Sequence, residues 1–452
     1  MRPRTIVLLA LLVCGVALTA CNRIRDGDAA TPISQSAADP ALTASIEKIR
    51  AVDNHTHVNT VVPGDSEFDA LPLDALLPFP LPGRLRPDNP DWLAAYRALY
   101  DYPHADLSEP HLAELRGTMQ KAARDHGEKF PEWVLDRIGT ETMLANRVAM
   151  GPGLAPPRFR LVSFVDALML PLSTKTEAGA TPDRQKLYPL EEKLLHRYLA
   201  DLHLDTMPAT LDAYVTTVVT PTLERQRQGG CVAVKFEAAY LRPLDFDEAP
   251  VESARSVYSR YANGGEPSHA EYKTLEDFLF RYSAREAGRL GMAVHIHSFE
   301  GAGAFYQAAG SDPLLLEPAF NDPGLRGTNF VIVHGGGLYA AHAGAMIAKP
   351  NVYLDISALT LIYTPATLAG TLRNWLLQYP EKVLFGSDAS AFGPDAGWEL
   401  TAWIGTTTGR QALALALSEM MRNGEVSRTR AEEIATMVMR TNAVQLYKLP
   451  LK

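Results

Sequence analysis

The stretch Val52-Asp-Asn-His-Thr-His-Val58 decides how the rest of the chain is interpreted. It places His55 and His57 two residues apart, after an apolar lead-in. In a β-strand the side chains of residues i and i+2 lie on the same face, so both imidazoles can contact one metal ion. An isolated His-x-His is more often a pair of surface histidines in a loop. Here three later segments of strand-like sequence also end in His or Asp: His297, His334 and Asp388.

Runs of apolar and β-branched residues alternate with helical patterns along most of the chain. Eight strands are expected, near residues 51–57, 147–150, 159–166, 231–236, 292–297, 329–334, 351–356 and 382–387. This alternation is typical of parallel βαβ units, and eight units predict a (β/α)8 TIM barrel with its active site at the carboxyl ends of the strands. An open doubly wound sheet is the alternative. It requires a nucleotide-binding fingerprint, and Gly301-Ala-Gly303 lacks the spacing of one.

A long segment separates the first two expected strands. Residues 61–89 are rich in Pro, Leu and Asp, which excludes a regular helix or a central strand. Residues 91–146 have a mainly helical pattern. We therefore expect a mostly helical insertion over about residues 58–130, which is either a cap over the site or an addition remote from it. Two further helical segments, 397–422 and 427–446, follow the last strand.

The N-terminus has the pattern of a secretory signal. Arg2 and Arg4 precede an apolar run from Ile6 to Leu18, and small residues then lead to Cys21. This ending resembles a bacterial lipobox, in which Cys21 carries the lipid. Asn22 after the cysteine favours the outer membrane of a Gram-negative bacterium, with the protein facing the periplasm. An uncleaved N-terminal anchor is the alternative.

The expected organisation has three parts: a signal peptide over residues 1–20, a lipidated cysteine and flexible tether over 21–40, and a barrel domain over 41–452. Cys231 is then the only cysteine of the barrel domain, so no internal disulfide is expected. The net charge is −9, from 43 basic and 52 acidic residues, and no basic stripe is present. Nucleic acid is therefore not an expected partner.

On the barrel interpretation, polar side chains gather at one end of the strands. In strand order they are His55 and His57, Lys235, His295 and His297, His334, Asp355, and Asp388. Burying a ring of His and Asp is costly unless a metal ion or a proton transfer uses it. Imidazole and carboxylate suit Zn²⁺ and similar divalent ions, and a catalytic ion lowers the pKa of its bound water towards ~7.

With these motifs in order, the chain resembles the amidohydrolase superfamily. The branch is the amidohydrolase-related (amidohydrolase-2) one, which contains metal-dependent hydrolases and aminocarboxymuconate-semialdehyde-type decarboxylases. The resemblance covers about residues 46–449. Its motifs are Asp53-x-His-x-His57, Val-His-Ile-His297-Ser, Val-Ile-Val-His334-Gly-Gly, Asn-Val-Tyr-Leu-Asp355-Ile-Ser, Tyr-Pro-Glu-Lys-Val-Leu-Phe-Gly-Ser-Asp388-Ala and a closing Thr-Asn-Ala-Val-Gln-Leu-Tyr. Each motif is weak alone, and their order is specific.

The resemblance implies roles for individual residues. It implies that His55, His57, His297 and Asp388 are the metal ligands. It further implies that His334 is the histidine beside them that acts as acid or base, and that Asp388 doubles as the proton acceptor.

Three positions leave alternatives open. His295 shares a strand face with His297, and the pattern of the branch favours His297 as the ligand, which makes His295 a substrate-binding or core residue. Lys235 is a substrate or structural lysine, paired with Glu237 on the same face. Some superfamily members carboxylate the corresponding lysine. If Lys235 is carboxylated, it bridges two metal ions; otherwise the site is expected to hold one ion. Arg242, just past the fourth strand, is a candidate for binding a substrate carboxylate, with a solvent-exposed loop arginine as the alternative.

The leading functional interpretation is a metal-dependent hydrolase, most simply a zinc enzyme, that acts on a C–N or C–O bond of a small-molecule amide, ester or lactone. Non-oxidative decarboxylation or hydration at the same site is the alternative. A non-catalytic metal- or ligand-binding lipoprotein is a third interpretation, which the presence of both His334 and Asp388 disfavours. A serine hydrolase is disfavoured too, because His334-Gly-Gly-Gly has no Gly-x-Ser-x-Gly elbow to accompany it. The sequence carries no prediction of oligomeric state.

Overall fold

The computed structural model describes residues 37–59, 69–76, 80–301 and 303–451. Every element below lies within Ala38–Lys452, which forms one compact unit. The expected signal peptide and Cys21 therefore lie outside the described residues, as does most of the tether. Within the part of the chain that the structure describes, every helix is too short or too polar to cross a bilayer.

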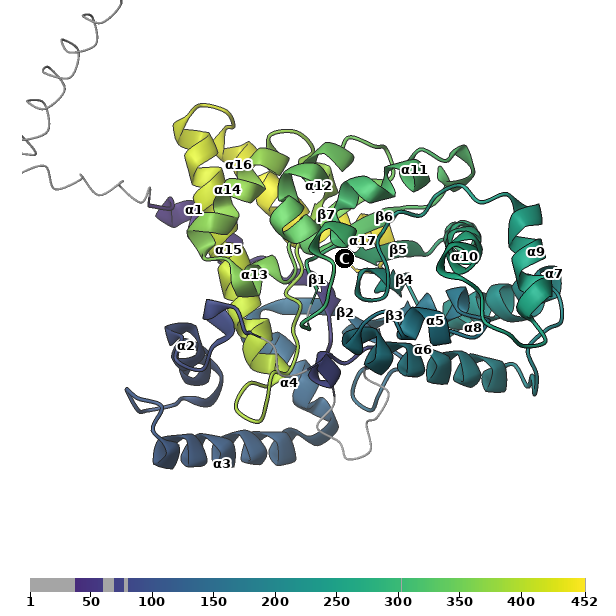
Figure 1. Ribbon diagram of the computed structural model, residues 1–452. Helices are drawn as coiled ribbons and strands as arrows, with labels where there is room; N and C mark the ends of the chain where they lie inside the picture. Colours follow the sequence, from purple (N-terminus) through teal and green to yellow (C-terminus); the bar gives the residue numbers. More distant parts are fainter. Residues whose placement is uncertain (1–36, 60–68, 77–79, 302, 452) are drawn as a thin grey trace, which may run out of the picture. The chain divides into compact units, whose positions relative to one another are not determined.

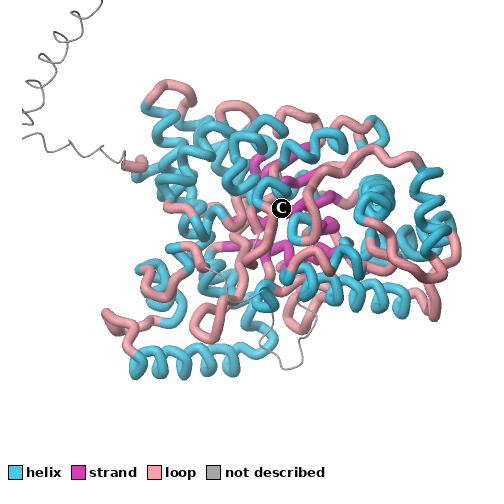
Figure 2. The backbone as a smooth tube through the Cα atoms, in the orientation of Figure 1, coloured by secondary structure: helices cyan, strands magenta, loops and turns pink. Residues whose placement is uncertain are grey.

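Eight parallel strands form one sheet in the order of the sequence (Figure 1). They are β1 Ala51–Thr56, β2 Thr140–Arg147, β3 Phe159–Phe164, β4 Ala233–Phe236, β5 Ala293–His297, β6 Phe330–Val333, β7 Val352–Asp355 and β8 Val383–Leu384. A parallel bridge between Thr56 and Ala389 joins β1 to the segment after β8, so the sheet forms a nearly closed barrel. Figure 2 shows the strands at the centre with helices around them. The predicted (β/α)8 barrel is confirmed.

Helices fill the connections between the strands and follow the last one. Their bounds are α1 Pro40–Glu47, α2 Pro90–Tyr100, α3 Glu109–His126, α4 Phe130–Ile138, α5 Lys175–Ala178, α6 Pro182–Asp201, α7 Leu211–Tyr214, α8 Thr220–Gln228, α9 Val251–Tyr261, α10 His269–Arg289, α11 Glu317–Phe320, α12 Ala340–Met346, α13 Leu359–Ile362, α14 Pro365–Leu376, α15 Trp398–Arg422, α16 Arg428–Thr436 and α17 Asn442–Tyr447. Several begin at a residue whose side chain accepts a hydrogen bond from the first turn. These caps include Asp39, Asn89, Thr181, Ser268, Thr364 and Ser427.

The sequence prediction is wrong about the second strand. β2 spans Thr140–Arg147, whereas the expected strand begins at residue 147 and the helical pattern was expected to run to 146. The helix ends earlier because Gly139, after α4, adopts the left-handed conformation (φ 69°) that favours glycine. β2 then pairs with β1 on one side and β3 on the other. The pairing with both neighbouring strands outweighs the helix propensity of Glu141, Leu144 and Ala145.

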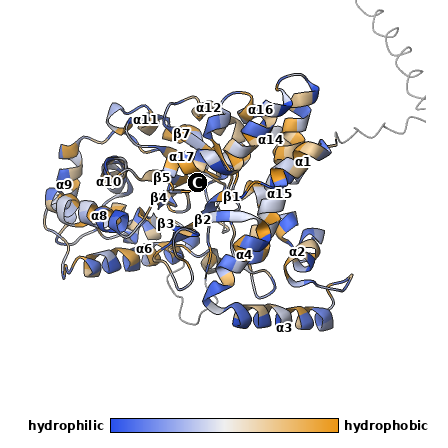
Figure 3. Cartoon of the chain, turned by 180° about the vertical axis from the view of Figure 1, so that it is seen from behind, coloured by the Kyte–Doolittle hydropathy of each residue, from blue (hydrophilic) through white to orange (hydrophobic). Residues whose placement is uncertain are grey.

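The segment between β1 and β2 carries α2, α3 and α4, which lie together in Figure 1. Trp92 and Tyr96 of α2 are buried in one apolar cluster with Trp398 of α15. α3 is mostly hydrophilic in Figure 3, and Leu115 is its buried side chain. The helical part of the insertion thus packs beside α15. A residue from the stretch before these helices, Asp69, reaches the candidate site described below.

The last helix joins the barrel. Ala443, Leu446 and Tyr447 of α17 belong to one buried cluster with strand residues such as Val52 and Leu144. Tyr447 is only 6% exposed, and its hydroxyl contacts a polar side chain of β1. The closing motif of the sequence therefore packs against the barrel strands that carry the candidate site.

Candidate metal centre

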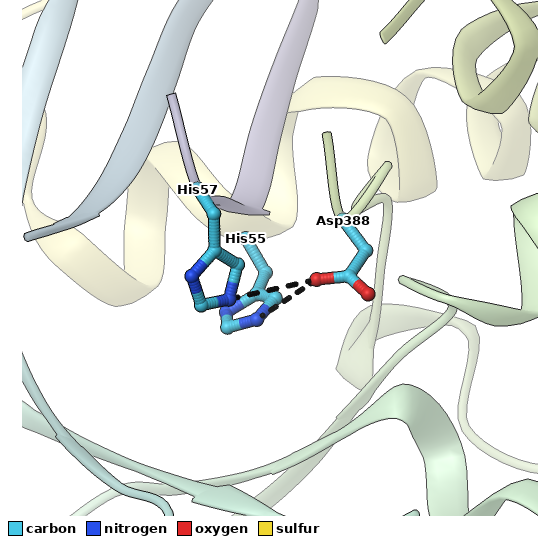
Figure 4. Close-up of side chains that lie close together, drawn as sticks. All are labelled: His55, His57 and Asp388. Atoms are coloured by element: carbon cyan, nitrogen blue, oxygen red, sulfur yellow. Dashed lines mark ion pairs between the residues drawn. The ribbon is translucent and has the colours of Figure 1, made fainter. Parts of the chain in front are cut away.

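The structure brings His55, His57 and Asp388 together (Figure 4). The two histidines lie at the end of β1, and Asp388 lies in the turn after β8. Asp388 Oδ1 is 3.3 Å from His55 Nε2 and 3.7 Å from His57 Nε2. The backbone fixes this approach, because Asp388 N donates to His55 O at 2.9 Å and His57 N donates to Ala389 O at 2.8 Å.

These separations fit a divalent ion. With metal–ligand bonds of about 2.0–2.2 Å, the ligand atoms of a tetrahedral ion lie about 3.3 Å apart. His57 Nδ1 is 3.0 Å from Asp69 Oδ2, so its N–H donates to a carboxylate and the lone pair of Nε2 faces Asp388. Metal-binding histidines are usually oriented in this way by a carboxylate or a carbonyl.

His55 is oriented by the side chain of Asn146. The amide Nδ2 of Asn146 lies 2.9 Å from His55 Nδ1. The other amide atom, Oδ1, is buried and has no hydrogen-bond partner in the described part of the chain. Nδ2 also donates to the Thr56 carbonyl oxygen at 3.0 Å, so the amide is held with its NH2 group towards His55 Nδ1. His55 Nδ1 is then the acceptor and Nε2 carries the proton towards Asp388 Oδ1, so a metal ion that takes Nε2 displaces that proton.

The two histidines of β1 are in different electrostatic surroundings. Burial lowers the pKa of His55 well below its usual value, and the charge of Lys235 adds to this effect. Burial acts on His57 in the same direction, but the carboxylates of Asp69 and Asp388 outweigh it and raise the pKa of His57. A metal ion that takes His57 Nε2 must displace the proton that these carboxylates favour, so metal binding here is coupled to proton release.

His297 and His334 form a hydrogen-bonded chain beside this group. His297 Nδ1 is 3.1 Å from His334 Nε2, and His334 Nδ1 is 2.9 Å from Ser357 Oγ. Ser357 Oγ donates to Asp355 Oδ1 at 2.6 Å. Because the Ser357 hydroxyl donates its only hydrogen to Asp355, it acts as the acceptor for His334 Nδ1–H. His334 Nε2 is then unprotonated and accepts from His297 Nδ1–H. The lone pair of His297 is thereby placed on Nε2, which is buried without a hydrogen-bond partner among the described residues.

Asp355 anchors this chain and connects it to α17. Its carboxylate also accepts from the backbone N–H of His334 at 2.8 Å and from Asn54 Nδ2 at 2.6 Å. Burial raises the pKa of Asp355 to about 6, against the opposing hydrogen bonds. The Tyr447 hydroxyl donates to Asn54 Oδ1 and lies 2.7 Å from His295 Nε2. His295 thus contacts α17 and lies outside the three-residue metal group; burial and the charge of Lys235 lower its pKa to about 3.

Lys235 lies close to the metal group. Its Nζ is 3.5 Å from His55 Nε2 and 3.5 Å from Glu237 Oε1, so the expected pairing with Glu237 is present. Burial raises the pKa of Glu237 to about 7, although the lysine opposes this. The backbone N–H of Glu237 donates to Asp166 Oδ2 at 2.7 Å, which fixes the chain after β4.

Arg242 is held by two carboxylates. Its guanidinium donates to Glu276 at 2.9 Å and to Asp277 at 2.7 Å, and it lies 4.4 Å from the ring of Phe246. The residue is 3% exposed, so the alternative of a solvent-exposed loop arginine is wrong. Binding of a substrate carboxylate by Arg242 stays a prediction.

Two site residues have unusual backbone conformations. His334 and Asp388 have φ angles of 66° and 60°, in the left-handed region that residues other than glycine rarely adopt. Three buried glycines follow His334. Gly386, two residues before Asp388, packs tightly against Ser357: a Cβ at Gly386 would lie 2.9 Å from Ser357 Cβ. Strain of this kind is retained where it positions functional groups.

Sequence reasoning missed several residues at this site. Asp69 lies in a Pro-rich stretch without periodicity, and Asn146 lies in the strand that was misplaced. Ser357 stands two residues after Asp355, a spacing that a strand-end analysis could have used. Tyr240, whose ring lies 4.4 Å from that of His297, stands in a turn after β4 that offers no such signal.

Comparison with known proteins places this site in a family. The amidohydrolase family profile matches residues 210–449, more than half of the chain, and the protein therefore belongs to the amidohydrolase family. A search of curated proteins gives no match. Together with the barrel and the His–His–Asp group, membership of this family indicates a metal-dependent enzyme.

Several solved structures share the fold. A protein described as a metal-dependent hydrolase, from Lactobacillus casei, is 16% identical over 90% of this chain and 97% of that one, with a TM-score of 0.55. A uronate isomerase from Thermotoga maritima is 15% identical over 90% and 96%, with a TM-score of 0.55. A glucuronate isomerase from Caulobacter crescentus is 13% identical over 93% and 97%, also with a TM-score of 0.55. At these identities the likeness extends to the fold alone.

Proposed function

We propose that this protein is a hydrolase that uses a metal-activated water to cleave a C–N or C–O bond of a small molecule. The observation that carries the proposal is the approach of His55, His57 and Asp388 at the carboxyl ends of β1 and β8, with His57 oriented by Asp69. This face of the barrel is where the active sites of such folds lie.

The proposed ion is Zn²⁺, because imidazole and carboxylate ligands suit it. His55, His57 and Asp388 would hold it, and His297 is the proposed fourth ligand because its buried Nε2 has no hydrogen-bond partner among the described residues. When bound, such an ion polarises a carbonyl group and lowers the pKa of a water molecule to about 7.

The side chains around this position supply the proton transfers. Asp388 is partly exposed, at 19% of its side chain, and its carboxylate is the proposed acceptor of the proton from the attacking water and its donor to the leaving group. His334 is neutral, since burial lowers its pKa well below the usual value. Its Nε2 can accept a second proton while Nδ1–H passes one through Ser357 Oγ to Asp355.

A site with two ions is the alternative. His297 Nδ1 and His334 Nε2 face each other at 3.1 Å, and Lys235 Nζ is 3.5 Å from His55 Nε2. If Lys235 were carboxylated, its carbamate would supply ligand oxygens to both ions, and His297 and His334 would act as ligands instead of bonding to each other. The number of ions per chain distinguishes these arrangements.

Product analysis in ¹⁸O-labelled water tests the reaction type. The purified full chain, loaded with Zn²⁺, is incubated with panels of amides, esters, lactones, carboxylic acids and uronates. Hydrolysis places ¹⁸O in a new carboxyl group, decarboxylation releases CO₂, and isomerisation does neither. Asp388→Asn should lose turnover, whereas Glu381→Gln, at an exposed position, should keep it. Release of CO₂ without label in the product would favour the decarboxylase alternative.

We also propose that the chain is exported and attached to a membrane by lipid on Cys21. The support is the sequence of residues 1–22, with its basic start, apolar run and lipobox-like end. Cys21→Ser should move the protein from the membrane fraction to the soluble one. Unchanged partitioning of this variant would instead favour an uncleaved N-terminal anchor.

A further inference from the structure

The insertion between β1 and β2 contacts two segments that leave the barrel at the carboxyl ends of its strands. Leu85 and Tyr96 of the insertion share a buried apolar cluster with Leu361, after β7, and Ala389, after β8. The loops that follow the strands of such a barrel build its active site. The insertion therefore reaches the proposed site at two places besides the contact that Asp69 makes.

Arg84 connects the insertion to the segment after β7. It lies in a short 3₁₀ turn, Gly83–Leu85, and its guanidinium donates to the backbone oxygens of Thr360, at 3.1 Å, and of Tyr363. Its Nε and Nη2 donate to Asp91 at 2.8 and 2.6 Å, which balances the charge. The side chain is 12% exposed, so these bonds are largely shielded from water. Arg84 thus ties both ends of α13 to the insertion.

The segment that Arg84 holds begins with a strained turn. Ala358 has a φ of 56° and a ψ of −44°, and the backbone N–H of Leu359 donates to Ser357 O at 2.6 Å. This is a γ-turn with positive φ, which is rare and costly for a residue with a side chain. Such a conformation persists only where the surroundings enforce it. Ser357 is the acceptor for His334, so the hold of Arg84 on α13 helps to keep this hydroxyl in place.

Arg116 of α3 and Tyr96 of α2 connect the insertion to the loop after β8. Arg116 Nε donates to Asp395 Oδ1 at 2.6 Å, and Nη2 donates to Oδ2 at 2.7 Å, so the guanidinium binds both carboxylate oxygens. The Tyr96 hydroxyl donates to the backbone oxygen of Asp395 at 2.8 Å. This loop follows directly on Asp388, and fixing it restricts the chain that carries the proposed ligand.

We infer that the insertion acts as a clamp on the metal site: Arg84 fixes the segment after β7, and Arg116 fixes the loop after β8. Both are positioning residues, because they act through Ser357 and Asp388. This inference rests on the proposed function, since it assigns the insertion a role in the same site. Contacts that hold ligand-bearing segments in place support metal binding in proteins.

The contact of Arg116 is tested on the full chain by hydrogen–deuterium exchange of residues 389–397 and by the rate of Zn²⁺ release to EDTA. Arg116→Met and Asp395→Asn should each exchange faster there and release Zn²⁺ about threefold to fivefold faster, the range that a partly exposed ion pair supports. The double variant should match the single ones, because all three lose the same bond. Glu109→Gln, which removes the other carboxylate partner of Arg116, is the matched control and should behave like the wild type.

The contact of Arg84 is tested by exchange of residues 359–364. Arg84→Met should exchange faster in this segment, because α13 loses its bonds to the insertion. Adding Ala358→Gly should restore part of the protection, since glycine adopts positive φ without strain and needs less enforcement. A purely structural loss of stability would not be reversed by this second substitution.

Exchange of residues 389–397 and Zn²⁺ release equal to those of the wild type in Arg116→Met would overturn the clamp. Faster exchange spread evenly over the whole chain would also overturn it, because it would mark a general loss of stability. The exchange measurements on metal-free protein separate this inference from the proposed function. A wild type that binds no Zn²⁺ contradicts the hydrolase, whereas a Zn²⁺-loaded wild type with unchanged exchange in both arginine variants contradicts only the clamp.

Discussion

Replacing Asp69 by Asn is expected to weaken metal binding without disturbing the barrel. Asp69 Oδ2 lies 3.0 Å from His57 Nδ1, and the two side chains are 12% and 15% exposed. The substitution removes one charge-assisted hydrogen bond, worth about 1.5–3 kcal/mol. That range corresponds to a loss of about 10–150-fold in affinity, consistent with the 10–100-fold typical of such orienting carboxylates.

The pH dependence of metal binding should change in a defined direction. In the wild type the pKa of His57 is raised by Asp69 and Asp388 against the effect of burial. Zn²⁺ competes with that proton, so affinity should rise with pH until the pH exceeds the raised pKa. In Asp69→Asn the pKa is lower, and the rise should occur at lower pH.

A competition titration with a chromophoric zinc chelator, from pH 5.5 to 8.5, measures both quantities. Asp88→Asn is the matched control, because this exposed aspartate lies in the same insertion. Zinc affinity in Asp69→Asn equal to that of the wild type at every pH would refute the claim that Asp69 orients a metal-binding His57.

Three further outcomes are expected. Ser357→Ala leaves His334 Nδ1–H without its acceptor and should reduce turnover about 10–100-fold at unchanged metal content. Initial rates and elemental analysis measure the two quantities. A rate equal to that of the wild type would contradict the proposed proton transfer from His334 through Ser357 to Asp355. Tyr447→Phe removes the hydrogen bonds to Asn54 and His295 and should lower the free energy of unfolding by about 1–3 kcal/mol in urea; an unchanged midpoint would contradict it. Glu191 is buried, and neither of its carboxylate oxygens has a hydrogen-bond partner among the described residues. Burial raises its pKa, so the folded state holds a proton that the unfolded chain releases, and the contribution of Glu191 to stability falls as pH rises above about 4.5. Glu191→Gln should therefore be more stable than the wild type at pH 8 and nearly equal to it at about pH 4.5, by thermal unfolding; equal stability at both pH values would contradict this.

The sequence predicts those parts of the site that strand periodicity governs. His55 and His57 meet at one ion position because a strand repeats every two residues, and Asp388 reaches them because the carboxyl ends of barrel strands converge. The order of the strands in the barrel follows from the same alternation of apolar runs and helices.

Contacts that depend on tertiary packing were not predictable in this way. Asp69 reaches His57 from an irregular stretch, whose path the neighbouring elements determine. β2 has the composition of a helix and is extended only because β1 and β3 flank it.

The most direct test of the central claim is the metal content per chain, measured by elemental mass spectrometry on purified wild type and on His57→Ala. One tightly bound Zn²⁺ in the wild type, and none in the variant, is the predicted result. Two ions would keep the metal site and assign Lys235 a bridging role. A wild type without metal, or a His57→Ala variant with as much metal as the wild type, would contradict the metal centre at His55, His57 and Asp388.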